Sequence, residues 1–246
     1  MPEPREALCY ALDVSTAKEA EAEVARLAPY AGMFKVGLQL FIREGPPLIR
    51  SLRERGAARI FLDLKLLDIP RTVRQARAAA GSMPVDLLSV HCEGLAGTPG
   101  VGAPEPAQEK TLPRLLAVTL LTSLDESDLR RLGYRRNLSL LDVVYLRTDI
   151  ARAAGCAGVV CSGREVEGVR NRAGSGFLVV TPGIRPSWAA VPGDDQQRTR
   201  TVRDAIRAGA DILVVGRPIR KAPDPVAAAQ RILDEIEQGR RDRFGA

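Results

Sequence analysis

The sequence of 246 residues contains one histidine, His91, and four cysteines. A single histidine excludes metal sites built from several histidines, and it excludes a serine–histidine relay placed anywhere else in the chain. The cysteines form no C-x-x-C pair, which argues against a disulfide framework and against structural zinc. We therefore expect no metal site. The cysteines are Cys9, Cys92, Cys156 and Cys161.

Long apolar runs are also missing. No stretch approaches the roughly 20 residues that cross a membrane. The N-terminus, MPEPREALCYALDVS, carries charge early and lacks the apolar core of a secretory signal. We therefore expect no membrane partner and a cytoplasmic location.

Aromatic residues make up only 4% of the chain, although its formal net charge is +6. The arginines are dispersed along the sequence, whereas a nucleic-acid surface usually clusters its basic residues. We therefore expect no nucleic-acid partner. The positive charge suits a small anionic ligand instead.

Lysine is scarce in a chain that is rich in arginine. Arginine does not give up its proton in proteins, whereas lysine can exchange one. A chain that uses arginine for surface charge has kept some lysines for chemistry that arginine cannot do. The lysines are Lys18, Lys35, Lys65, Lys110 and Lys221.

Strand-like apolar runs alternate with segments of helical spacing along the whole chain. This alternation predicts a parallel sheet covered by helices, and eight such units predict a closed (β/α)8 TIM barrel in a single domain over 1–246. An open, doubly wound sheet is the alternative. The predicted strands are 8–13, 33–38, 59–65, 86–91, 115–121, 157–162, 177–181 and 211–216, and the predicted helices are 16–27, 41–55, 71–80, 140–154, 164–172, 199–208 and 225–237.

The slot for the fourth helix is irregular. Residues 94–113 are rich in glycine and proline, so we expect mostly loop there, with a short or broken helix at best.

Polar residues stand at the ends of nearly all predicted strands. In a parallel barrel these ends meet on one face, which is where barrel active sites lie. The alternative is that each strand simply ends at the first polar residue. That alternative accounts for any one of these residues, but it accounts poorly for two lysines and two aspartates at strand ends. The residues are Asp13, Lys35, Asp63, Lys65, His91, Thr122, Ser123, Ser162, Thr181, Gly216 and Arg217.

The stretch FLDLKLLDIPRTV (61–73) places an acid, a base and a second acid in one short run. Asp63 and Lys65 are two residues apart, so on a strand they point to the same side. Asp68 lies beyond the strand, where a loop can return it towards the lysine. Nearby carboxylates favour the ammonium form of a lysine, which makes Lys65 a positioned proton donor. A structural salt bridge is the plainer interpretation of Asp63 and Lys65 alone.

Two later stretches predict an anion site. TPGIRP (181–186) follows the seventh predicted strand, and VVGRPI (214–219) follows the eighth. Phosphate sites of barrels are commonly built from the loops after these two strands. Gly183 and Gly216 let backbone amides approach an anion, and Arg185 or Arg217 can bind it with two parallel hydrogen bonds. A phosphorylated small molecule is therefore the predicted ligand.

Taken together, these stretches resemble the orotidine 5′-phosphate decarboxylase family over almost the whole chain. The combination of D-x-K-x-x-D with TPGIR, DDQ and VGR is highly specific. The matching blocks are ALD (11–13), FKVGLQLF (34–41), FLDLKLLDIPRTV (61–73), SVH (89–91), AVTLLTSLD (117–125), GVVCS (158–162), TPGIRP (181–186), GDDQQR (193–198) and GADILVVGRPI (209–219).

The resemblance implies a homodimeric barrel that converts orotidine 5′-phosphate to UMP and carbon dioxide without a metal or organic cofactor. It implies that Lys65 protonates C6 of the pyrimidine and that Asp63 lies against the substrate carboxylate. Lys35 and Asp13 are implied to contact the ribose hydroxyls. Asp68 is implied to reach the active site of the other subunit.

The resemblance also implies a set of substrate-binding residues. Two lie near Asp68, a Thr–Ser pair meets the pyrimidine, a glutamine bridges base and phosphate, and the others line the phosphate end. We further expect the loop over 183–196 to act as a lid. The implied residues are Ile69, Thr72, Thr122, Ser123, Gln196, Pro182, Arg185, Gly216 and Arg217.

The sequence departs from the family pattern at three places. Leu67 stands where related bacterial sequences commonly have histidine, and Arg71 stands where they have asparagine or threonine. The segment after the SVH block reads CEGLAG (92–97) in place of a small residue followed by two glycines. None of these changes removes an implied catalytic group.

Two other functions stay open at this point. A magnesium-dependent sugar-phosphate decarboxylase of the same superfamily, such as 3-keto-L-gulonate 6-phosphate decarboxylase, also has the D-x-K-x-x-D block. The DDQ and LTS stretches favour a nucleotide substrate instead. A non-catalytic nucleotide-binding protein on the same barrel would be expected to lack a catalytic group, yet Asp63, Lys65 and Asp68 are all present.

Overall fold

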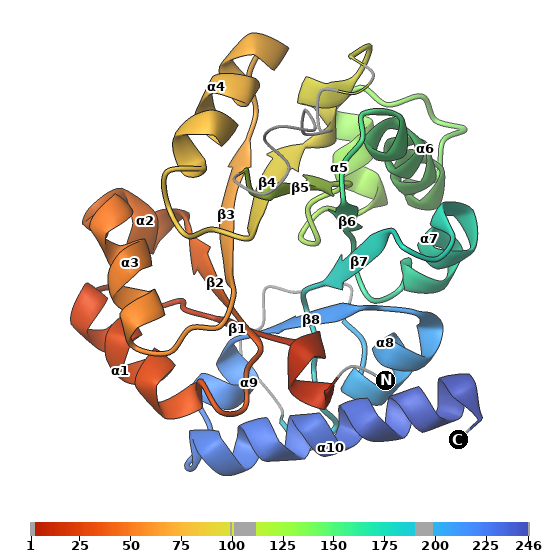
Figure 1. Cartoon of the computed structure of the whole chain (residues 1–246). Coiled ribbons are helices and arrows are strands. Elements are labelled where there is room, and N and C mark those ends of the chain that lie inside the picture. Colours follow the sequence, from red (N-terminus) through yellow and green to blue (C-terminus); the bar gives the residue numbers. More distant parts are fainter. Residues whose placement is uncertain (1–2, 99, 101–111, 190–198, 246) are drawn as a thin grey trace.

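The structure is a computed structural model that describes residues 3–98, 100, 112–189 and 199–245. Eight parallel strands close into one barrel in sequence order (Figure 1). The predicted (β/α)8 barrel and all eight predicted strands are therefore confirmed, and the open sheet is excluded. The strands are β1 Leu8–Ala11, β2 Met33–Gly37, β3 Ile60–Leu66, β4 Leu87–His91, β5 Arg114–Val118, β6 Gly158–Val160, β7 Leu178–Thr181 and β8 Ile212–Val215.

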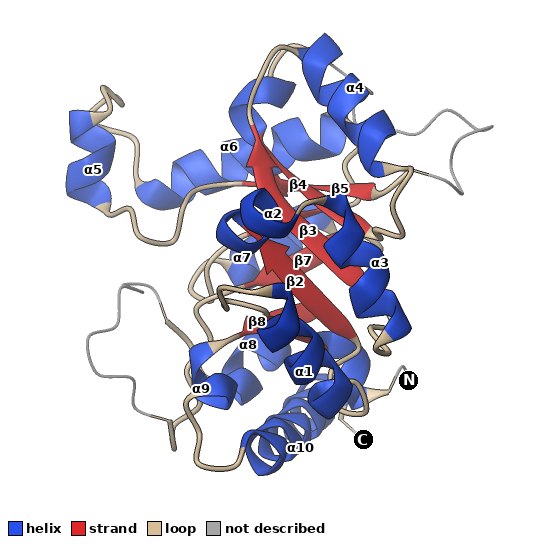
Figure 2. Cartoon of the chain, turned by 90° about the vertical axis from the view of Figure 1, so that its left-hand side faces the viewer, coloured by secondary structure: helices blue, strands red, loops and turns tan. Residues whose placement is uncertain are grey.

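Helices surround the strands (Figure 2). Each of the seven predicted helical segments contains helix in the structure, with shifts of a few residues at most ends. The helices are α1 Ala17–Leu27, α2 Leu38–Glu44, α3 Pro46–Glu54, α4 Pro70–Ala80, α5 Glu126–Arg131, α6 Leu140–Ala153, α7 Val166–Ala173, α8 Val202–Ala208, α9 Arg217–Arg220 and α10 Pro225–Phe244, with 3-10 turns η1 Pro4–Ala7 and η2 Cys92–Leu95.

Three differences from the predicted helices have local causes. The helix expected over 41–55 is two helices, because Gly45 between them adopts a φ of 68° and Pro46 opens the second. The last helix, α10, extends beyond the predicted residue 237 to Phe244. The short helices α5 and α9 are too brief for a periodic pattern to reveal.

The irregular fourth slot contains the 3-10 turn η2 directly after β4. This agrees with the expected short helical piece. Of the predicted loop over 94–113, residues 99 and 101–111 lie outside the described residues.

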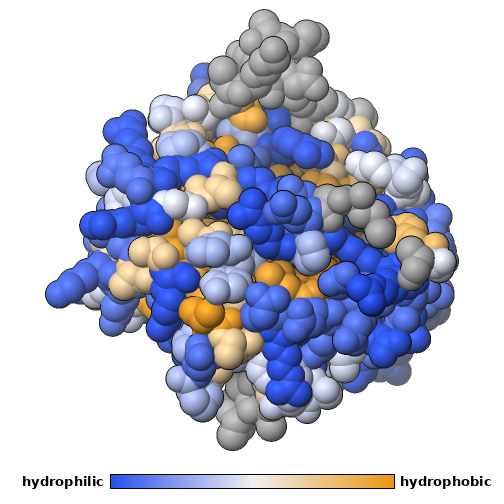
Figure 3. All heavy atoms as spheres, turned by 60° about the horizontal axis from the view of Figure 1, so that its bottom comes forward, coloured by the Kyte–Doolittle hydropathy of each residue, from blue (hydrophilic) through white to orange (hydrophobic). Residues whose placement is uncertain are grey.

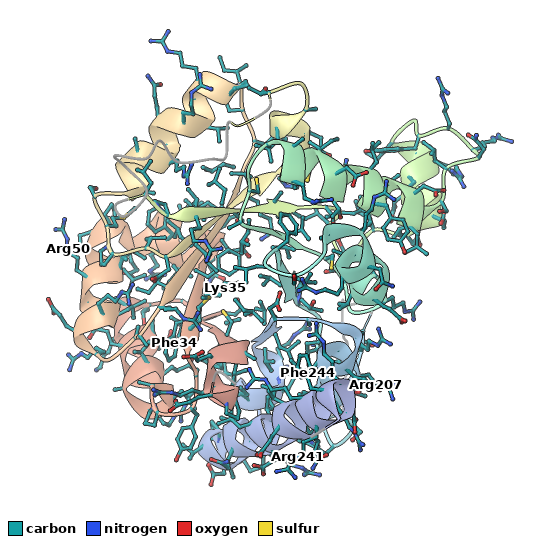
Figure 4. All side chains as sticks on the ribbon, turned by 45° about the vertical axis from the view of Figure 1, so that its right-hand side comes forward. Phe34, Lys35, Arg50, Arg207, Arg241 and Phe244 are labelled. Atoms are coloured by element: carbon teal, nitrogen blue, oxygen red, sulfur yellow. The ribbon has the colours of Figure 1, made fainter. Side chains whose placement is uncertain are left out.

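Successive residues of a strand point to opposite sides of the sheet, so the barrel has two apolar layers. In β2, Phe34 packs outward among the residues that contact the helices, and its neighbour Lys35 points into the barrel mouth (Figure 4). The inner layer is a separate cluster that fills the barrel below that mouth. Its residues are Cys9, Ala11, Met33, Phe61, Leu87, Leu116, Val180, Ile212 and Val214.

The outer surface is mostly polar. The side of the molecule that carries α10 shows hydrophilic side chains with small, scattered apolar patches (Figure 3). Among the helices of the described ranges, none is long and apolar enough to cross a membrane.

An ion pair fixes the unusual segment after β4. The buried guanidinium of Arg147, on α6, pairs with Glu93 of η2 and donates hydrogen bonds to the Thr119 carbonyl and to the Tyr134 hydroxyl at 2.6 Å. A hydrogen bond with His91 and the charge of Arg147 lower the pKa of Glu93 below its usual value. Glu93 therefore links the end of β4 to α6.

We predict that Arg147→Met destabilises the fold by about 2 kcal/mol, since it removes hydrogen bonds from a buried charged donor. Arg172→Met is the matched control, because Arg172 forms a solvent-exposed pair with Asp149 from α7 to α6. The control should cost less than about 1 kcal/mol. Urea unfolding of both variants measures the difference, and equal losses would contradict a special role for Arg147.

Candidate active site

The carboxyl ends of the strands surround a cavity of about 240 Å³. Its polar residues continue the inward-pointing positions of the strands: Ala11 is followed two residues later by Asp13, and Phe61 by Asp63. The apolar inner layer thus forms the floor and the charged residues form the wall. The lining residues are Ala11, Asp13, Lys35, Phe61, Asp63, Lys65, Thr122, Val160, Pro182, Gly183, Arg185, Val214, Gly216 and Arg217.

Most of the predicted site residues meet in this cavity. Four others, Asp68, Ile69, Thr72 and Ser123, are described but do not line it. Gln196 lies outside the described residues, as does half of the loop expected to act as a lid, residues 190–196.

Four charged side chains of alternating sign form a row across the cavity wall. Lys35 Nζ lies 3.4 Å from Asp13 Oδ1 and 3.7 Å from Asp63 Oδ2. Lys65 Nζ lies 2.7 Å from the same Asp63 oxygen. Each inner charge therefore has an opposite charge on both sides, which offsets the cost of burying it.

The row keeps its two most buried members ionised. Burial alone would lower the pKa of Lys35, but Asp13 and Asp63 raise it above the usual value. Burial alone would raise the pKa of Asp63, but Lys35, Lys65 and a hydrogen bond from Ser89 bring it below the usual value. Stability from Asp63 is therefore present at neutral pH and is lost as the pH falls through its lowered pKa.

Lys65 has an unusual backbone. Its φ of 51° makes it the one positive-φ residue other than glycine in the described part of the chain. The pairing of β3 with β4 also shifts register between Leu62 and Leu66, which spans this residue. Backbone strain of this kind is concentrated at functional sites.

Among the described residues, Asp68 forms no ion pair with Lys65. Its carboxylate accepts a hydrogen bond from the backbone N–H of Ile69 at 2.7 Å, and it is exposed. The expectation that a loop returns Asp68 towards the lysine therefore stays a prediction.

Two arginines form the other end of the cavity. Arg185 and Arg217 line it from the loops after β7 and β8, together with Gly183, whose φ of 73° allows the turn that presents Arg185. The Arg185 backbone N–H donates to the Arg200 carbonyl at 2.9 Å. Four cationic and two anionic side chains give the described cavity wall a net charge of +2.

Contacts from the rest of the chain hold the Arg185 loop. Trp188 donates its indole N–H to Glu235 of α10 at 2.6 Å, and the Arg231 guanidinium carbon lies 4.6 Å from the centre of the Trp188 ring. On the other side of the loop, Arg200 donates to the Gly163 carbonyl at 2.9 Å.

Sequence reasoning missed several residues of the site. The apolar floor residues Ala11, Phe61, Val160 and Val214 were assigned only to strands, although the period of two along each strand would have placed them inward. Ser89 was also missed, because a serine inside an apolar strand gives no signal until its partners are known.

The departures from the family pattern have partial explanations. Leu67 lies beside Gly94, where a side chain would meet the Leu67 methyl and come within 3.1 Å of the Asp68 carbonyl. The altered segment after β4 thus packs against the altered position before Asp68. Nothing in the structure explains Arg71.

In the described ranges no group of three or more His, Cys, Asp or Glu residues could hold a metal ion.

Comparison with known proteins gives consistent matches over nearly the full chain. Residues 6–232 match the model of the orotidine 5′-phosphate decarboxylase / HUMPS family. The chain is 46% identical to a protein named orotidine 5′-phosphate decarboxylase from Desulfosudis oleivorans, covering 96% of this chain and 94% of that protein. A protein of the same name from Moorella thermoacetica is 44% identical and covers 95% and 93%.

Solved structures agree with these matches. The crystal structure of orotidine 5′-phosphate decarboxylase from Lactobacillus acidophilus has a TM-score of 0.77 at 34% identity, covering 93% of this chain and 98% of that one. The enzyme of the same name from Pyrococcus horikoshii has a TM-score of 0.70 at 27% identity, covering 94% and 99%. The barrel, the charged row and these matches together show that the chain belongs to the orotidine 5′-phosphate decarboxylase / HUMPS family.

Proposed function

We propose that this protein decarboxylates orotidine 5′-phosphate to UMP and carbon dioxide, the last step of UMP synthesis. One observation carries the proposal: the ammonium of Lys65, paired at 2.7 Å with Asp63, shares a cavity with Arg185 and Arg217. An acid–base pair at one end and two guanidinium groups at the other suit a small phosphorylated substrate. Relatives named for this reaction support it.

The reaction needs a cation beside the carbon that loses carbon dioxide. The electron pair left at C6 of the pyrimidine has no adjacent carbonyl that could delocalise it. We assign its stabilisation to the Lys65 ammonium, which then transfers a proton to C6. Asp63 holds that ammonium in place, and no metal or organic cofactor takes part in the proposed reaction.

The remaining residues take the roles that the family resemblance implies. Asp13 and Lys35 would contact the ribose hydroxyls from the middle of the cavity, which they line. Arg185, Arg217, Pro182 and Gly216 would surround the phosphate. We assign Thr122 and Ser123 to the pyrimidine, and Gln196 to a bridge between the base and the phosphate.

We also propose that the protein acts as a homodimer with shared active sites. Asp68 is exposed, and among the described residues it forms no ion pair with Lys65. Large apolar side chains are exposed around it, which is typical of a surface that a partner covers. Ile69 and Thr72 would then lie beside the partner's substrate. These exposed apolar side chains are Leu67 and Ile69, on either side of Asp68 in the chain.

We predict that the wild-type protein turns over orotidine 5′-phosphate and that Lys65→Ala lowers kcat at least about 1,000-fold, because proton donor and carbanion stabiliser are lost together. The absorbance of the substrate during turnover measures the effect. Lys221→Ala, an exposed lysine outside the cavity, is the control and should keep wild-type activity.

Two outcomes of this assay would replace the proposal. A pure wild-type protein that binds UMP tightly and turns nothing over would be a nucleotide-binding protein. Complete loss of activity in excess EDTA, restored by magnesium, would indicate the metal-dependent sugar-phosphate class. We expect EDTA to leave the activity unchanged.

The cytoplasmic location stays a prediction.

Arg217→Ala should weaken UMP binding about 10- to 100-fold, the value of one or two hydrogen bonds from a charged donor to phosphate. Lys65→Ala should change UMP affinity much less, since the ammonium faces the base end. Calorimetric titration with UMP measures both. Equal UMP affinity in Arg217→Ala and wild type would refute the assignment of Arg217 to the phosphate.

Mixing inactive Lys65→Ala and Asp68→Ala proteins should restore activity, because each mixed dimer contains one site with both residues intact. With random exchange of subunits, half of the dimers are mixed, so about one quarter of wild-type activity should return. Subunit exchange is verified with a tagged copy. No recovery despite exchange would show that Asp68 does not act across an interface.

A further inference from the structure

Ser89 lies in the middle of β4 and is fully buried. It contacts Asp63 and Lys65 of the neighbouring strand β3. Its Oγ is 2.8 Å from the backbone nitrogen of Lys65 and 2.8 Å from Asp63 Oδ1. The direction of both hydrogen bonds is fixed by chemistry, because an amide can only donate and a carboxylate can only accept. The hydroxyl therefore accepts from Lys65 and gives its single proton to Asp63.

The first of these hydrogen bonds acts on a strained residue. Lys65 has the left-handed φ of 51°, and β3 changes its register against β4 between Leu62 and Leu66. An L-residue other than glycine keeps such a backbone only when its surroundings enforce it. Ser89 satisfies the N–H of that strained residue directly from the neighbouring strand.

The second hydrogen bond acts on the partner of the same lysine. Asp63 uses Oδ1 for the Ser89 hydroxyl and Oδ2 for Lys65 Nζ at 2.7 Å. One serine thus holds the backbone of the lysine and the carboxylate that directs its ammonium. Without the hydroxyl, the Lys65 N–H would lose this acceptor, and Asp63 could rotate about its side chain.

We propose that Ser89 is a positioning residue for the decarboxylation: its hydroxyl locks the left-handed backbone of Lys65 and the orientation of Asp63, and so fixes where the ammonium meets C6. This inference rests on the proposed function. It assigns Ser89 no contact with the substrate, because Ser89 does not line the cavity. Its loss should therefore act on the chemical step and leave phosphate binding intact.

Ser89→Ala should lower kcat about 100-fold, the scale on which misplacement of a catalytic group acts. Affinity for UMP should stay at the wild-type value, since Arg185 and Arg217 are untouched. Ser89→Cys should give an intermediate kcat, because a thiol has nearly the same shape but is a weak donor and acceptor. Steady-state kinetics and UMP titration measure this split.

The pH profile gives a second readout. Asp63 faces Lys35, Lys65 and the Ser89 hydroxyl, and Cys9 below it stays neutral because burial raises the pKa of that thiol to about 12. Removing the Ser89 hydrogen bond should raise the pKa of Asp63. Since the proposed chemistry needs the carboxylate, the acidic limb of kcat should move to higher pH in Ser89→Ala.

Thr119→Val is the matched control. Thr119 is also fully buried, and its hydroxyl donates to the Val160 carbonyl at 2.9 Å; the charged Arg147 contacts only the backbone carbonyl of Thr119, which the substitution keeps. Both variants should lower the melting temperature to a similar extent, but only Ser89→Ala should lower kcat and shift the pH profile.

The outcomes separate this inference from the function on which it rests. Wild-type turnover together with an unchanged kcat and pH profile in Ser89→Ala would overturn the role of Ser89 alone. An equal loss of kcat in Thr119→Val would do the same, since it would make the effect one of general stability. Absence of turnover in the wild type would overturn the proposed function and the role of Ser89 with it.

Discussion

The row Asp13–Lys35–Asp63–Lys65 is the constraint on which the barrel mouth depends. Lys35 and Asp63 are nearly buried, and an isolated charge at such a position would be neutralised or would unfold the site. Alternation of sign solves this problem, because each buried charge has an opposite charge on either side. The same alternation keeps Asp63 ionised despite its burial. Removing one member would leave its neighbours unbalanced, so the four residues act as one unit.

The fold provides this row through simple strand geometry. Strands β1, β2 and β3 are adjacent in the closed barrel, and their inward positions carry apolar residues below and charged residues above. Phe61 fills the floor and Asp63, two residues later, reaches the wall. Lys65 breaks the regular pattern, since its left-handed backbone and the register shift against β4 place its ammonium beside Asp63 at the end of the strand. The site is thus regular barrel up to Asp63 and irregular from there on.

This boundary also separates what the sequence could predict from what it could not. The strands, the barrel and the gathering of Asp13, Lys35 and Asp63 follow from periodicity, because a period of two fixes which side chains share a face. The positive φ of Lys65 and the role of Ser89 depend on contacts between strands, which periodicity does not contain. Gly45 followed by Pro46 could have indicated the break between α2 and α3. The link from Glu93 to Arg147 joins residues 54 positions apart and leaves no local pattern.

Charge balance relates this geometry to the proposed reaction. The described cavity wall has a net charge of +2, which matches a phosphate dianion such as that of UMP. The substrate carries one further negative charge on its carboxylate, and the carboxylate would lie against Asp63. In the proposed reaction, departure of neutral carbon dioxide would move that charge to C6, which the Lys65 ammonium would face. The wall would then complement the charge distribution that develops during the reaction better than the one that enters, which is the condition for catalysis by differential binding. In this proposal, Arg185 and Arg217 would supply, through the phosphate, the binding energy that brings the unmatched carboxylate into place.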